Sequence, residues 1–396
     1  MAALRRWLPL AVIGAVVVAC GAGSGETPTP TATAVPPTAT APGDEPLRWG
    51  YNPLQATGEH DSQALYNPPP LGYRIETVLS GLDRPTQLAA IPDGRLLVTE
   101  QAGTVRVVQD GRLLDEPFFA VDVYLPQLDG TVELGLVGIA IDPEFDEQPY
   151  VYLSYAADNP RRTVIARVRD EGGRGVDLEE ILSWEAAPIC CHIGGGMTFA
   201  PDGTLFIGAG DHGMPNVAQD PTQPPGSILR INRDGSIPPD NPFGGPVYAY
   251  GLRNPYDVAI DPETGRIFAG ENGFFGQDAV VEIKAGANYG WLLPASRVAE
   301  EEIEDPLIFY HNSYGMAGME FYSSDVLSEL QGRLFFCQFN SGGAVRELEL
   351  LPDGAVGRDA TRAPGCTTGI ATGADGFLYF LNYVDGTLTR IALAEE

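Results

Sequence analysis

The sequence predicts an all-β fold, a six-bladed β-propeller in a single domain, preceded by a lipoprotein signal and a disordered linker. Six short segments predict the blades, since each joins a turn rich in Pro, Asp and Gly to an apolar strand. They begin at Pro92, Asp142, Pro201, Asp261, Gln331 and Ala374. Most follow a second apolar strand, as in "TQLAAI", "LVGIAI" and "YDVAI", and no convincing long helical period is present. Repeats of about 40 to 70 residues that contain several strands are typical of propeller blades.

The first segment, residues 1–20, is predicted to be a lipoprotein signal peptide. Arg5 and Arg6 precede an apolar run that is too short for a stable spanning helix. The run ends in "VVAC", which is similar to a bacterial lipobox whose cleavage leaves Cys20 as a lipid-carrying N-terminus. The alternatives are an ordinary signal peptide and a hydrophobic anchor.

Residues 21–48 are predicted to be a disordered tether, and residues 49–396 the propeller. Pro, Thr and Ala dominate the tether, and large apolar side chains are scarce, so this segment cannot bury enough surface to fold. The blade repeats are recognisable from about Leu71 onwards. A lipid at Cys20, a spacer and a globular body together predict a protein anchored to the cell membrane on its extracytoplasmic side.

The charge balance argues against some partners. The chain has 53 Asp and Glu against 24 Lys and Arg, and such a surface repels nucleic acid and anionic lipid headgroups. If Cys20 carries lipid, four cysteines remain, and an even number in an exported protein suggests disulfides. Cys190, Cys191, Cys337 and Cys366 allow three pairings.

Candidate catalytic residues lie where the innermost strand of a repeat begins. His192 precedes such a strand in the third repeat, and Asp211 follows the next strand of the same blade. One strand up and one strand down could bring the two side chains together, so that the carboxylate orients the imidazole as a general base. A structural His with a carboxylate partner is the alternative.

Other repeats carry polar side chains at the matching place. Arg253 and Asn254 precede the inner strand of the fourth repeat, where a guanidinium could face a carbonyl or carboxylate in the channel, although a salt bridge within the loop is the alternative. Glu133 stands before the second repeat. Tyr314 and His311 stand before the fifth.

The stretch "AGENGFFGQDAVVEIKAGANYGW" is a candidate Ca²⁺ site. Hard oxygen ligands in a turn-rich loop suit this ion, although no EF-hand spacing is present. The side-chain candidates are Glu271, Asn272, Asp278 and Tyr289, with backbone carbonyls at Gly273 and Phe274. Cys190, Cys191 and His192 are too contiguous to enclose a zinc ion, and neither a nucleotide loop nor a nucleophile elbow occurs.

Long motifs of this chain resemble the soluble glucose and aldose sugar dehydrogenases. The matching stretches include "RPTQLAAIPDGRLLVTEQAGTVRVV", "LGLVGIAIDPEF", "HIGGGMTFAPDGTLFIGAGD", "SILRINRDGSIPPDNPF", "YAYGLRNPYDVAIDPETGRIFAGENG" and "GANYGW". The resemblance runs from about Gly72 to the C-terminus. It implies a six-bladed propeller that uses pyrroloquinoline quinone (PQQ) and Ca²⁺.

The resemblance also implies roles for individual residues. His192 falls on the base that takes the proton of the anomeric hydroxyl while hydride passes from the sugar to the quinone. Asp211 falls on the carboxylate that orients this histidine, and Arg253 on the arginine that polarises the quinone carbonyl. Asn254 and Asn272 fall on loops near the cofactor, and Glu133 falls where a polar cofactor contact is expected.

The last two blades depart from the pattern of the family. The resemblance implies basic side chains there, because PQQ carries three carboxylates. This sequence instead places Cys, Gln, Asn and Thr in those loops, and the candidate cofactor contacts become Gln338, Asn340 and Thr367. Arg346 is the one basic residue nearby and is expected on a strand. The calcium site of the family uses a Glu where this chain has Ala279.

The resemblance places Cys337 and Cys366 so that a disulfide could join the last two blades, which leaves Cys190 and Cys191 for each other. The larger eight-bladed quinoprotein alcohol dehydrogenases provide an analogy for such a vicinal disulfide beside PQQ, although their fold differs. Cross-pairing among the four cysteines is the alternative.

The predicted function is an extracytoplasmic PQQ-dependent dehydrogenase that oxidises an aldose sugar or related alcohol to a lactone, with His192 as general base. The alternative is a propeller lipoprotein that has lost PQQ and binds a carbohydrate or a protein. The chain has no haem-attachment Cys-x-x-Cys-His, so electrons are expected to leave to a separate acceptor.

Overall fold

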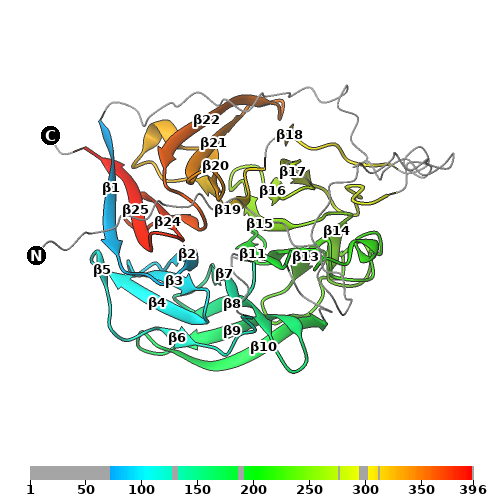
Figure 1. The fold of residues 1–396 in the computed structure, drawn as a ribbon, viewed down its shortest axis with the longest axis horizontal. Helices are drawn as coiled ribbons and strands as arrows, with labels where there is room; N and C mark the ends of the chain where they lie inside the picture. Colours follow the sequence, from blue (N-terminus) through cyan, green and yellow to red (C-terminus); the bar gives the residue numbers. More distant parts are fainter. Residues whose placement is uncertain are drawn as a thin grey trace, which may run out of the picture. The chain divides into compact units, whose positions relative to one another are not determined.

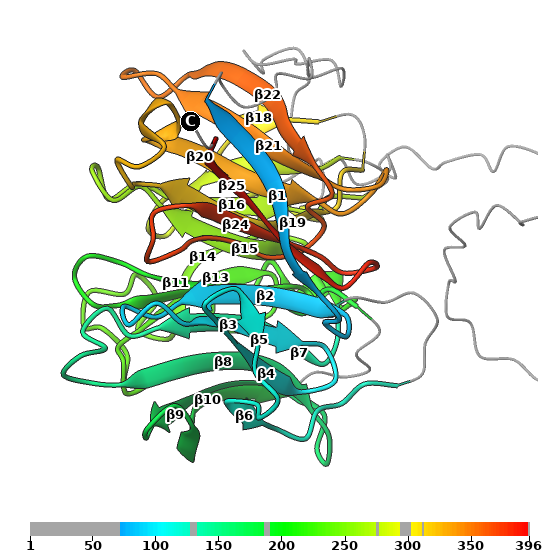
Figure 2. The same ribbon diagram turned by 90° about the vertical axis from the view of Figure 1, so that its left-hand side faces the viewer.

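The computed structural model describes residues 72–126, 133–185, 191–274, 277–293, 302–310 and 313–394, and in these residues it confirms the all-β propeller. Six antiparallel sheets surround a common axis as blades (Figure 1). The side view shows the strands of successive blades stacked around the ring (Figure 2). Among the described residues, the structure has no helix with the length and apolar character needed to cross a membrane.

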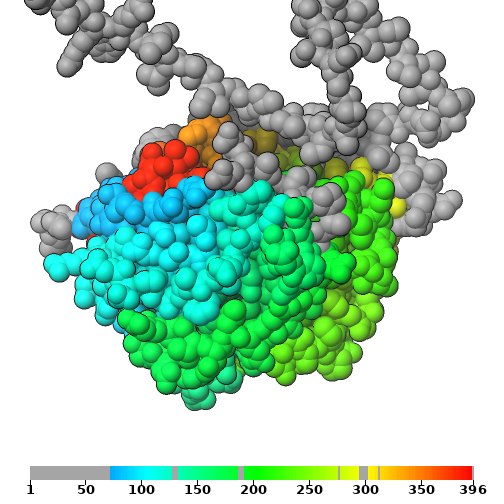
Figure 3. Space-filling view, turned by 60° about the horizontal axis from the view of Figure 1, so that its bottom comes forward, coloured from blue at the N-terminus to red at the C-terminus, as the bar shows by residue number. Residues whose placement is uncertain are grey.

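The first three blades follow one another along the chain, and Figure 3 shows them in blue-cyan to green. Blade 1 contains β2 (Pro85–Ala90), β3 (Leu96–Glu100), β4 (Thr104–Gln109), β5 (Arg112–Leu113) and β6 (Phe119–Ala120). Blade 2 contains β7 (Leu136–Ile141), β8 (Tyr150–Ala157), β9 (Arg162–Asp170) and β10 (Gly175–Glu185). Blade 3 contains β11 (Gly194–Phe199), β12 (Leu205–Ala209), β13 (Ser227–Ile231) and β14 (Val247–Tyr250), with the short helix η1 (Pro215–Val217) in its β12–β13 loop.

The remaining blades complete the ring. Blade 4 contains β15 (Pro255–Ile260), β16 (Ile267–Glu271), β17 (Ala279–Ile283) and β18 (Ile308–Phe309). Blade 5 contains β19 (Met316–Tyr322), η2 (Ser328–Leu330), β20 (Arg333–Gln338), β21 (Ala344–Leu350) and β22 (Val356–Pro364). Blade 6 contains β23 (Ile370–Thr372), β24 (Leu378–Asn382), β25 (Thr387–Leu393) and β1 (Tyr73–Ser80).

The repeats in the sequence correspond to the first two strands of each blade. The six predicted turn-and-strand segments contain β3, β8, β12, β16, β20 and β24. The strands before them, β2, β7, β11, β15, β19 and β23, line the axis, and each packs against the next around a closed ring. All six inner strands begin at the same end of the channel, so the loops before them converge there.

The two ends of the described chain close the ring together. β1 pairs antiparallel with β25, with Tyr73 opposite Leu393 and Ser80 opposite Thr387, so the outermost strand of blade 6 comes from the start of the domain. This pairing fastens the last blade to the first and covers the edge that β25 would otherwise expose.

Buried apolar side chains fill the space between neighbouring blades. One cluster joins blades 1 and 2 through residues such as Leu97, Leu136 and Val151, and another joins blades 3 and 4 through Phe206 and Val258. Successive residues of an inner strand therefore point alternately to the blade before and the blade after. Because both directions are buried, the inner strands consist of nearly continuous apolar residues.

Close packing at the axis depends on glycine. Asp257 of β15 lies in the channel, where its Oδ2 accepts hydrogen bonds from Gln87 Nε2 at 2.9 Å and Met319 N at 2.8 Å. A Cβ atom added to Gly196 of β11 would lie 2.0 Å from Asp257 Oδ1. Gly196 therefore leaves room for a carboxyl group that contacts strands from three blades.

We expect Gly196→Ala to destabilise the fold by about 1–3 kcal/mol, since either the Asp257 side chain or the backbone of β11 must move. Chemical denaturation measures the change. Gly245→Ala is the matched control, because no atom lies within 4 Å of a Cβ added at that position. Equal stability of the two variants would contradict the packing described for the axis.

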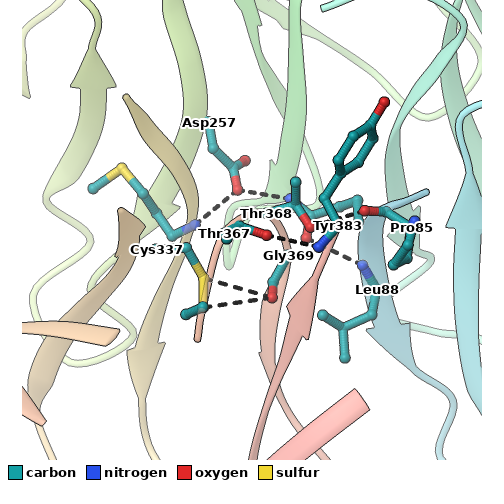
Figure 4. Close-up of a disulfide and its surroundings, with 11 residues drawn as sticks. Pro85, Leu88, Asp257, Cys337, Thr367, Thr368, Gly369 and Tyr383 are labelled. Atoms are coloured by element: carbon teal, nitrogen blue, oxygen red, sulfur yellow. Dashed lines mark hydrogen bonds between the residues drawn. A yellow bond between two sulfur atoms is a disulfide. The ribbon is translucent and has the colours of Figure 1, made fainter. Parts of the chain in front are cut away.

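A disulfide joins the last two blades, as predicted. Cys337 in β20 is bonded to Cys366, just before β23, with their Cα atoms 5.0 Å apart. Figure 4 shows both sulfur atoms near the carbonyl oxygen of Gly369, at 3.6 and 4.0 Å. This bond contradicts the alternative in which all four cysteines cross-pair. Cys190 lies outside the described residues, so its link to Cys191 stays a prediction.

Replacing both Cys337 and Cys366 with alanine is expected to lower the free energy of unfolding by about 2–4 kcal/mol. The bond closes a loop with a sequence separation of 29 residues, and both cysteines are fully buried. Thermal unfolding with and without reductant measures the effect. A double variant as stable as the oxidised parent would contradict a structural role for this bond.

Candidate active site

The side chains predicted to carry chemistry meet at the end of the channel where the inner strands begin. His192 precedes β11 and Asp211 follows β12, and the two strands are paired with Gly194 opposite Ala209. A Cβ atom on Gly210 would lie 2.1 Å from the carbonyl oxygen of His192. Glycine at that position thus allows the two loops to approach each other closely.

His192 and Asp211 form the predicted pair. Nδ1 of His192 lies 2.7 Å from Oδ1 of Asp211, whose side chain is 2% exposed. The other carboxylate oxygen accepts a hydrogen bond from Nε1 of Trp291 at 2.8 Å. Burial opposes the charge on Asp211, but hydrogen bonds from His192, Gly213 and Trp291 outweigh it and hold the pKa of the carboxyl below its usual range.

Arg253 faces the other ring nitrogen of the imidazole. Its Nη2 lies 2.7 Å from Nε2 of His192, and its Nη1 donates to the carbonyl oxygen of Asn272 at 2.6 Å. A guanidinium group can only donate, so Nε2 is the acceptor and Nδ1 carries the proton that Asp211 binds. His192 is therefore in the neutral tautomer that a general base requires at Nε2.

The second histidine of this region, His212, is not suited to the same role. Its side chain is fully buried and its Nε2 lies 3.3 Å from Thr163 Oγ1 and 3.4 Å from Trp184 Nε1. Burial lowers the pKa of His212 to about 4. The side chain of His192, by contrast, is 14% exposed, so a ligand can approach it.

Glu271 fixes the loop that carries the arginine. Its Oε1 accepts hydrogen bonds from the backbone N–H groups of Arg253 at 2.8 Å and Asn254 at 3.1 Å. The side chain is fully buried, and this burial raises its pKa to about 8. The sequence predicted Glu271 as a calcium ligand, whereas in the structure it hydrogen-bonds the backbone of the loop that precedes β15.

Glu133 and the two asparagines lie around the same centre. Glu133 Oε2 accepts hydrogen bonds from the backbone N–H of His192 and, at 3.4 Å, from Nδ2 of Asn254. Asn272 donates through Nδ2 to the carbonyl oxygen of Met316 at 2.8 Å. The structure thus brings together the residues predicted from different repeats.

The three side chains of the last two blades that were predicted to contact the cofactor form hydrogen bonds with other parts of the chain. Gln338 donates to the carbonyl oxygen of Asn340 at 3.1 Å, and Asn340 donates to the carbonyl oxygen of Ser313 at 3.0 Å. The hydroxyl of Thr367 accepts the backbone N–H of Tyr383 at 2.7 Å (Figure 4). These bonds stabilise the loops, and the three side chains offer no charge to a ligand.

Arg346 lies on a strand, as expected, and is not available to an anion in the channel. It is buried in β21, is paired with Asp359, and lies 4.8 Å from the ring centroid of Tyr314. Tyr314 is itself buried and packs against Tyr310 with ring centroids 4.7 Å apart. His311, named with Tyr314 as a candidate, lies outside the described residues.

The side chains predicted to bind calcium have separate hydrogen-bond partners and do not converge on one point. Asp278 accepts backbone N–H groups from Gly273 at 3.1 Å and Gly315 at 2.8 Å, and burial raises its pKa to about 6. The Tyr289 hydroxyl instead donates to the carbonyl oxygen of Glu282 at 2.6 Å. Phe274 is half exposed and its ring lies 6.2 Å from that of Trp291. In the described residues, no group of three His, Cys, Asp or Glu side chains could hold a metal ion.

Some contacts were not predicted from the sequence, one within the site and others between blades 1 and 6. Trp291 is recognisable there only as part of the motif "GANYGW", and nothing in that motif alone shows that its indole reaches Asp211. Arg84 and Tyr383 both contact Gln101, which lies where blade 1 meets blade 6. The contact between Gln101 and Tyr383 spans 282 residues, so local patterns could not predict it.

Comparisons with known proteins identify the family of this chain. The family model of glucose and sorbosone dehydrogenases matches residues 82–390. An aldose sugar dehydrogenase of Escherichia coli K12 is 28% identical over 345 residues, which cover 79% of this chain and 90% of the relative. A quinoprotein glucose dehydrogenase of Acinetobacter calcoaceticus is 32% identical over 253 residues, covering 54% and 52%.

Solved structures show the same fold. A candidate glucose dehydrogenase of Thermus thermophilus aligns with a TM-score of 0.71 at 32% identity, covering 81% of this chain and all of that one. A PQQ-bound aldose sugar dehydrogenase of Streptomyces coelicolor aligns with a TM-score of 0.67 at 25% identity, covering 82% of this chain and all of that one. The chain therefore belongs to the glucose/sorbosone dehydrogenase family of oxidoreductases.

Proposed function

We propose that this protein is a PQQ-dependent dehydrogenase that oxidises an aldose to its lactone, with His192 as the general base. The observation that carries the proposal is the arrangement around Nε2 of His192. Asp211 binds the opposite nitrogen of the ring at 2.7 Å, and Arg253 lies 2.7 Å from Nε2 itself. A base with a fixed tautomer next to a permanent cation suits the removal of a proton while negative charge develops nearby.

The comparisons support the choice of substrate and cofactor. The relatives are named aldose sugar dehydrogenase and quinoprotein glucose dehydrogenase, and one aligned structure is described as PQQ-bound. When bound, PQQ supplies an electrophilic quinone that accepts hydride and both of its electrons. Arg253 is the donor in this chain that would hold its oxygens, because the side-chain N–H groups of Asn254 and Asn272 already donate to Glu133 and to the carbonyl oxygen of Met316.

Arg253 fits the quinone part of such a cofactor, because its planar group presents several N–H donors. The side-chain oxygens of Asn254 and Asn272 are buried with no hydrogen-bond partner among the described residues, and as acceptors they could bind an N–H or O–H group of a ligand. Buried polar atoms of this kind are normally satisfied, so their clustering around Arg253 is consistent with a polar ligand that completes them. The calcium prediction has no matching side-chain set in the described residues, and no step is assigned to a metal.

The residues of this chain then act as follows. Asp211 holds the Nδ1 proton of His192, so Nε2 keeps its lone pair for the C1 hydroxyl of the sugar. Because Arg253 donates to Nε2 in this structure, the substrate hydroxyl must replace the guanidinium at that atom. The hydroxyl proton passes to Nε2, the C1 hydrogen leaves with its electron pair, and the C–O bond becomes the carbonyl of the lactone.

The alternative function is a carbohydrate- or protein-binding propeller without PQQ. The neutral contacts at Gln338, Asn340 and Thr367, together with the pairing of Arg346 with Asp359, favour it, since they leave few cations for a tricarboxylate. The His192, Asp211 and Arg253 arrangement favours the enzyme, because a binding protein has no evident need for an oriented base beside a cation.

We also propose that the protein is displayed outside the cytoplasmic membrane through a lipid on Cys20, and that a separate carrier accepts the electrons. The disulfide between Cys337 and Cys366 supports an oxidising compartment. Metabolic labelling with a radioactive fatty acid should modify the parent and not Cys20→Ser. Equal labelling of the two proteins would exclude this anchor.

Reconstitution tests the proposed activity. The purified protein is mixed with PQQ, with and without Ca²⁺, and reduction of an artificial dye is followed with a panel of aldoses. We expect a quinone absorbance change on binding and aldose-dependent dye reduction. A protein that binds no PQQ at high micromolar cofactor would exclude the enzyme, and one that binds a carbohydrate without PQQ would support the alternative.

A further inference from the structure

We infer that Trp291 is a positioning residue that sets Asp211 and Arg253 relative to His192, an inference that rests on the proposed function. Trp291 is the last residue of the motif "GANYGW" and is 6% exposed. Its indole contacts the two groups that act on opposite sides of the imidazole. Like His192 itself, Trp291 therefore contacts both Asp211 and Arg253.

The contact with Asp211 satisfies a buried anion. Oδ1 of Asp211 accepts from His192 and from the backbone of Gly213 at 2.8 Å, whereas Oδ2 has Nε1 of Trp291, at 2.8 Å, as its donor among the described residues. Without the indole, a carboxylate oxygen in a side chain only 2% exposed would have no donor there. The carboxylate would then be free to rotate away from the Nδ1 proton that it must hold.

The contact with Arg253 uses the face of the same ring. The Cζ atom of Arg253 lies 5.9 Å from the ring centroid of Trp291, within the range of a cation–π interaction. This interaction favours a guanidinium that stays beside the ring while its N–H groups move from Nε2 of His192 to an oxygen of the cofactor. Trp291 therefore provides a donor in the ring plane and a cation site on the ring face.

The backbone around Trp291 is built to hold the ring in place. Its N–H donates to the carbonyl oxygen of Gly251 at 2.8 Å, and its own carbonyl accepts from Gln219 Nε2 at 2.8 Å. Gly251 stands two residues before Arg253, and a Cβ atom there would lie 2.1 Å from Oδ1 of Asn288. The segment that carries the indole is thus packed directly against the loop that carries the arginine.

The test compares two Trp→Phe variants. Trp291→Phe keeps an aromatic face near Arg253 but removes the donor to Asp211. Trp184→Phe is the matched control, since Trp184 is also buried and its indole N–H lies near a histidine, His212, outside the catalytic set. In the PQQ-loaded protein we expect Trp291→Phe to lower kcat about tenfold with little change in KM. Trp184→Phe should retain the parent kcat.

An unchanged kcat in Trp291→Phe, or an equal loss in Trp184→Phe, would overturn the inference. A second measurement requires neither enzyme turnover nor a folded Trp291 variant. In the cofactor-free protein, the indole N–H resonance of Trp291, identified by removing the other three tryptophans in Trp7→Phe, Trp49→Phe and Trp184→Phe, should move upfield in Asp211→Asn. If it does not move, the contact on which the inference depends is absent.

The two measurements also separate this inference from the proposed function. If the parent protein oxidises no aldose but the indole resonance still responds to Asp211→Asn, the proposed function fails while the contact stands. If the parent is active, kcat is unchanged in Trp291→Phe and the indole resonance does not move in Asp211→Asn, the inference fails and the function stands.

Discussion

Replacing His192 with alanine is expected to lower kcat for aldose oxidation by about 10²–10⁴-fold, the usual contribution of a positioned general base. The imidazole is the group that can take the hydroxyl proton. Asp211 fixes its tautomer through Nδ1, and Nε2, which accepts from Arg253 in this structure, is the nitrogen with the free lone pair for a proton. Steady-state dye reduction by the PQQ-loaded variant measures the loss.

Two controls show whether the loss is chemical. Thermal unfolding of His192→Ala should match the parent closely, since the side chain is part-buried and stands before β11 rather than within it. Asp211→Asn keeps the imidazole but changes the group that holds its Nδ1 proton, and it should also lose kcat. Normal turnover in His192→Ala would remove the assigned base, whatever the result for Asp211→Asn.

Arg253→Met is expected to lower kcat by about 10²–10³-fold, the effect found when a preorganised donor to developing negative charge is removed. The side chain is held by Asn272, His192 and the face of Trp291, so its cation is already in place before the reaction. Arg253→Lys keeps the charge but not the planar fork of donors, and should recover only part of the activity.

PQQ binding and stability provide the controls for this variant. We expect weaker binding of PQQ, measured by the quinone absorbance change, together with the loss of kcat. Arg390→Met, which breaks an ion pair with Glu76 on the outer edge of blade 6, should leave both quantities unchanged. Full kcat in Arg253→Met would show that the guanidinium does not stabilise charge in the transition state.

Local sequence patterns predicted the architecture because each blade repeats one unit. The turn before β12, "PDGT", and the apolar strand after it have the same form as those before β3 and β24, so six matches implied six blades. The closing contact between β1 and β25 has no such repeat. It joins residues 73–80 to residues 387–393, and only the requirement that a ring must close selects this pairing.

The same distinction applies to the site. His192, Asp211 and Arg253 were predictable because the strand pairing of one blade and the start of the next inner strand place them at one end of the channel. The roles of Glu271 and Trp291 were not, since Glu271 acts on backbone N–H groups and Trp291 reaches Asp211 across a separation of 80 residues. The composition of a loop does not show whether a carboxylate faces a metal or a backbone amide.

The most direct test of the account is a single turnover without an electron acceptor. PQQ-loaded protein is mixed with an excess of aldose under anaerobic conditions, and the quinone absorbance and the lactone are measured together. We predict reduction of the bound PQQ with formation of an equal amount of lactone, and neither change on the same timescale in His192→Ala. Bound PQQ that stays oxidised with every aldose tested would contradict the account.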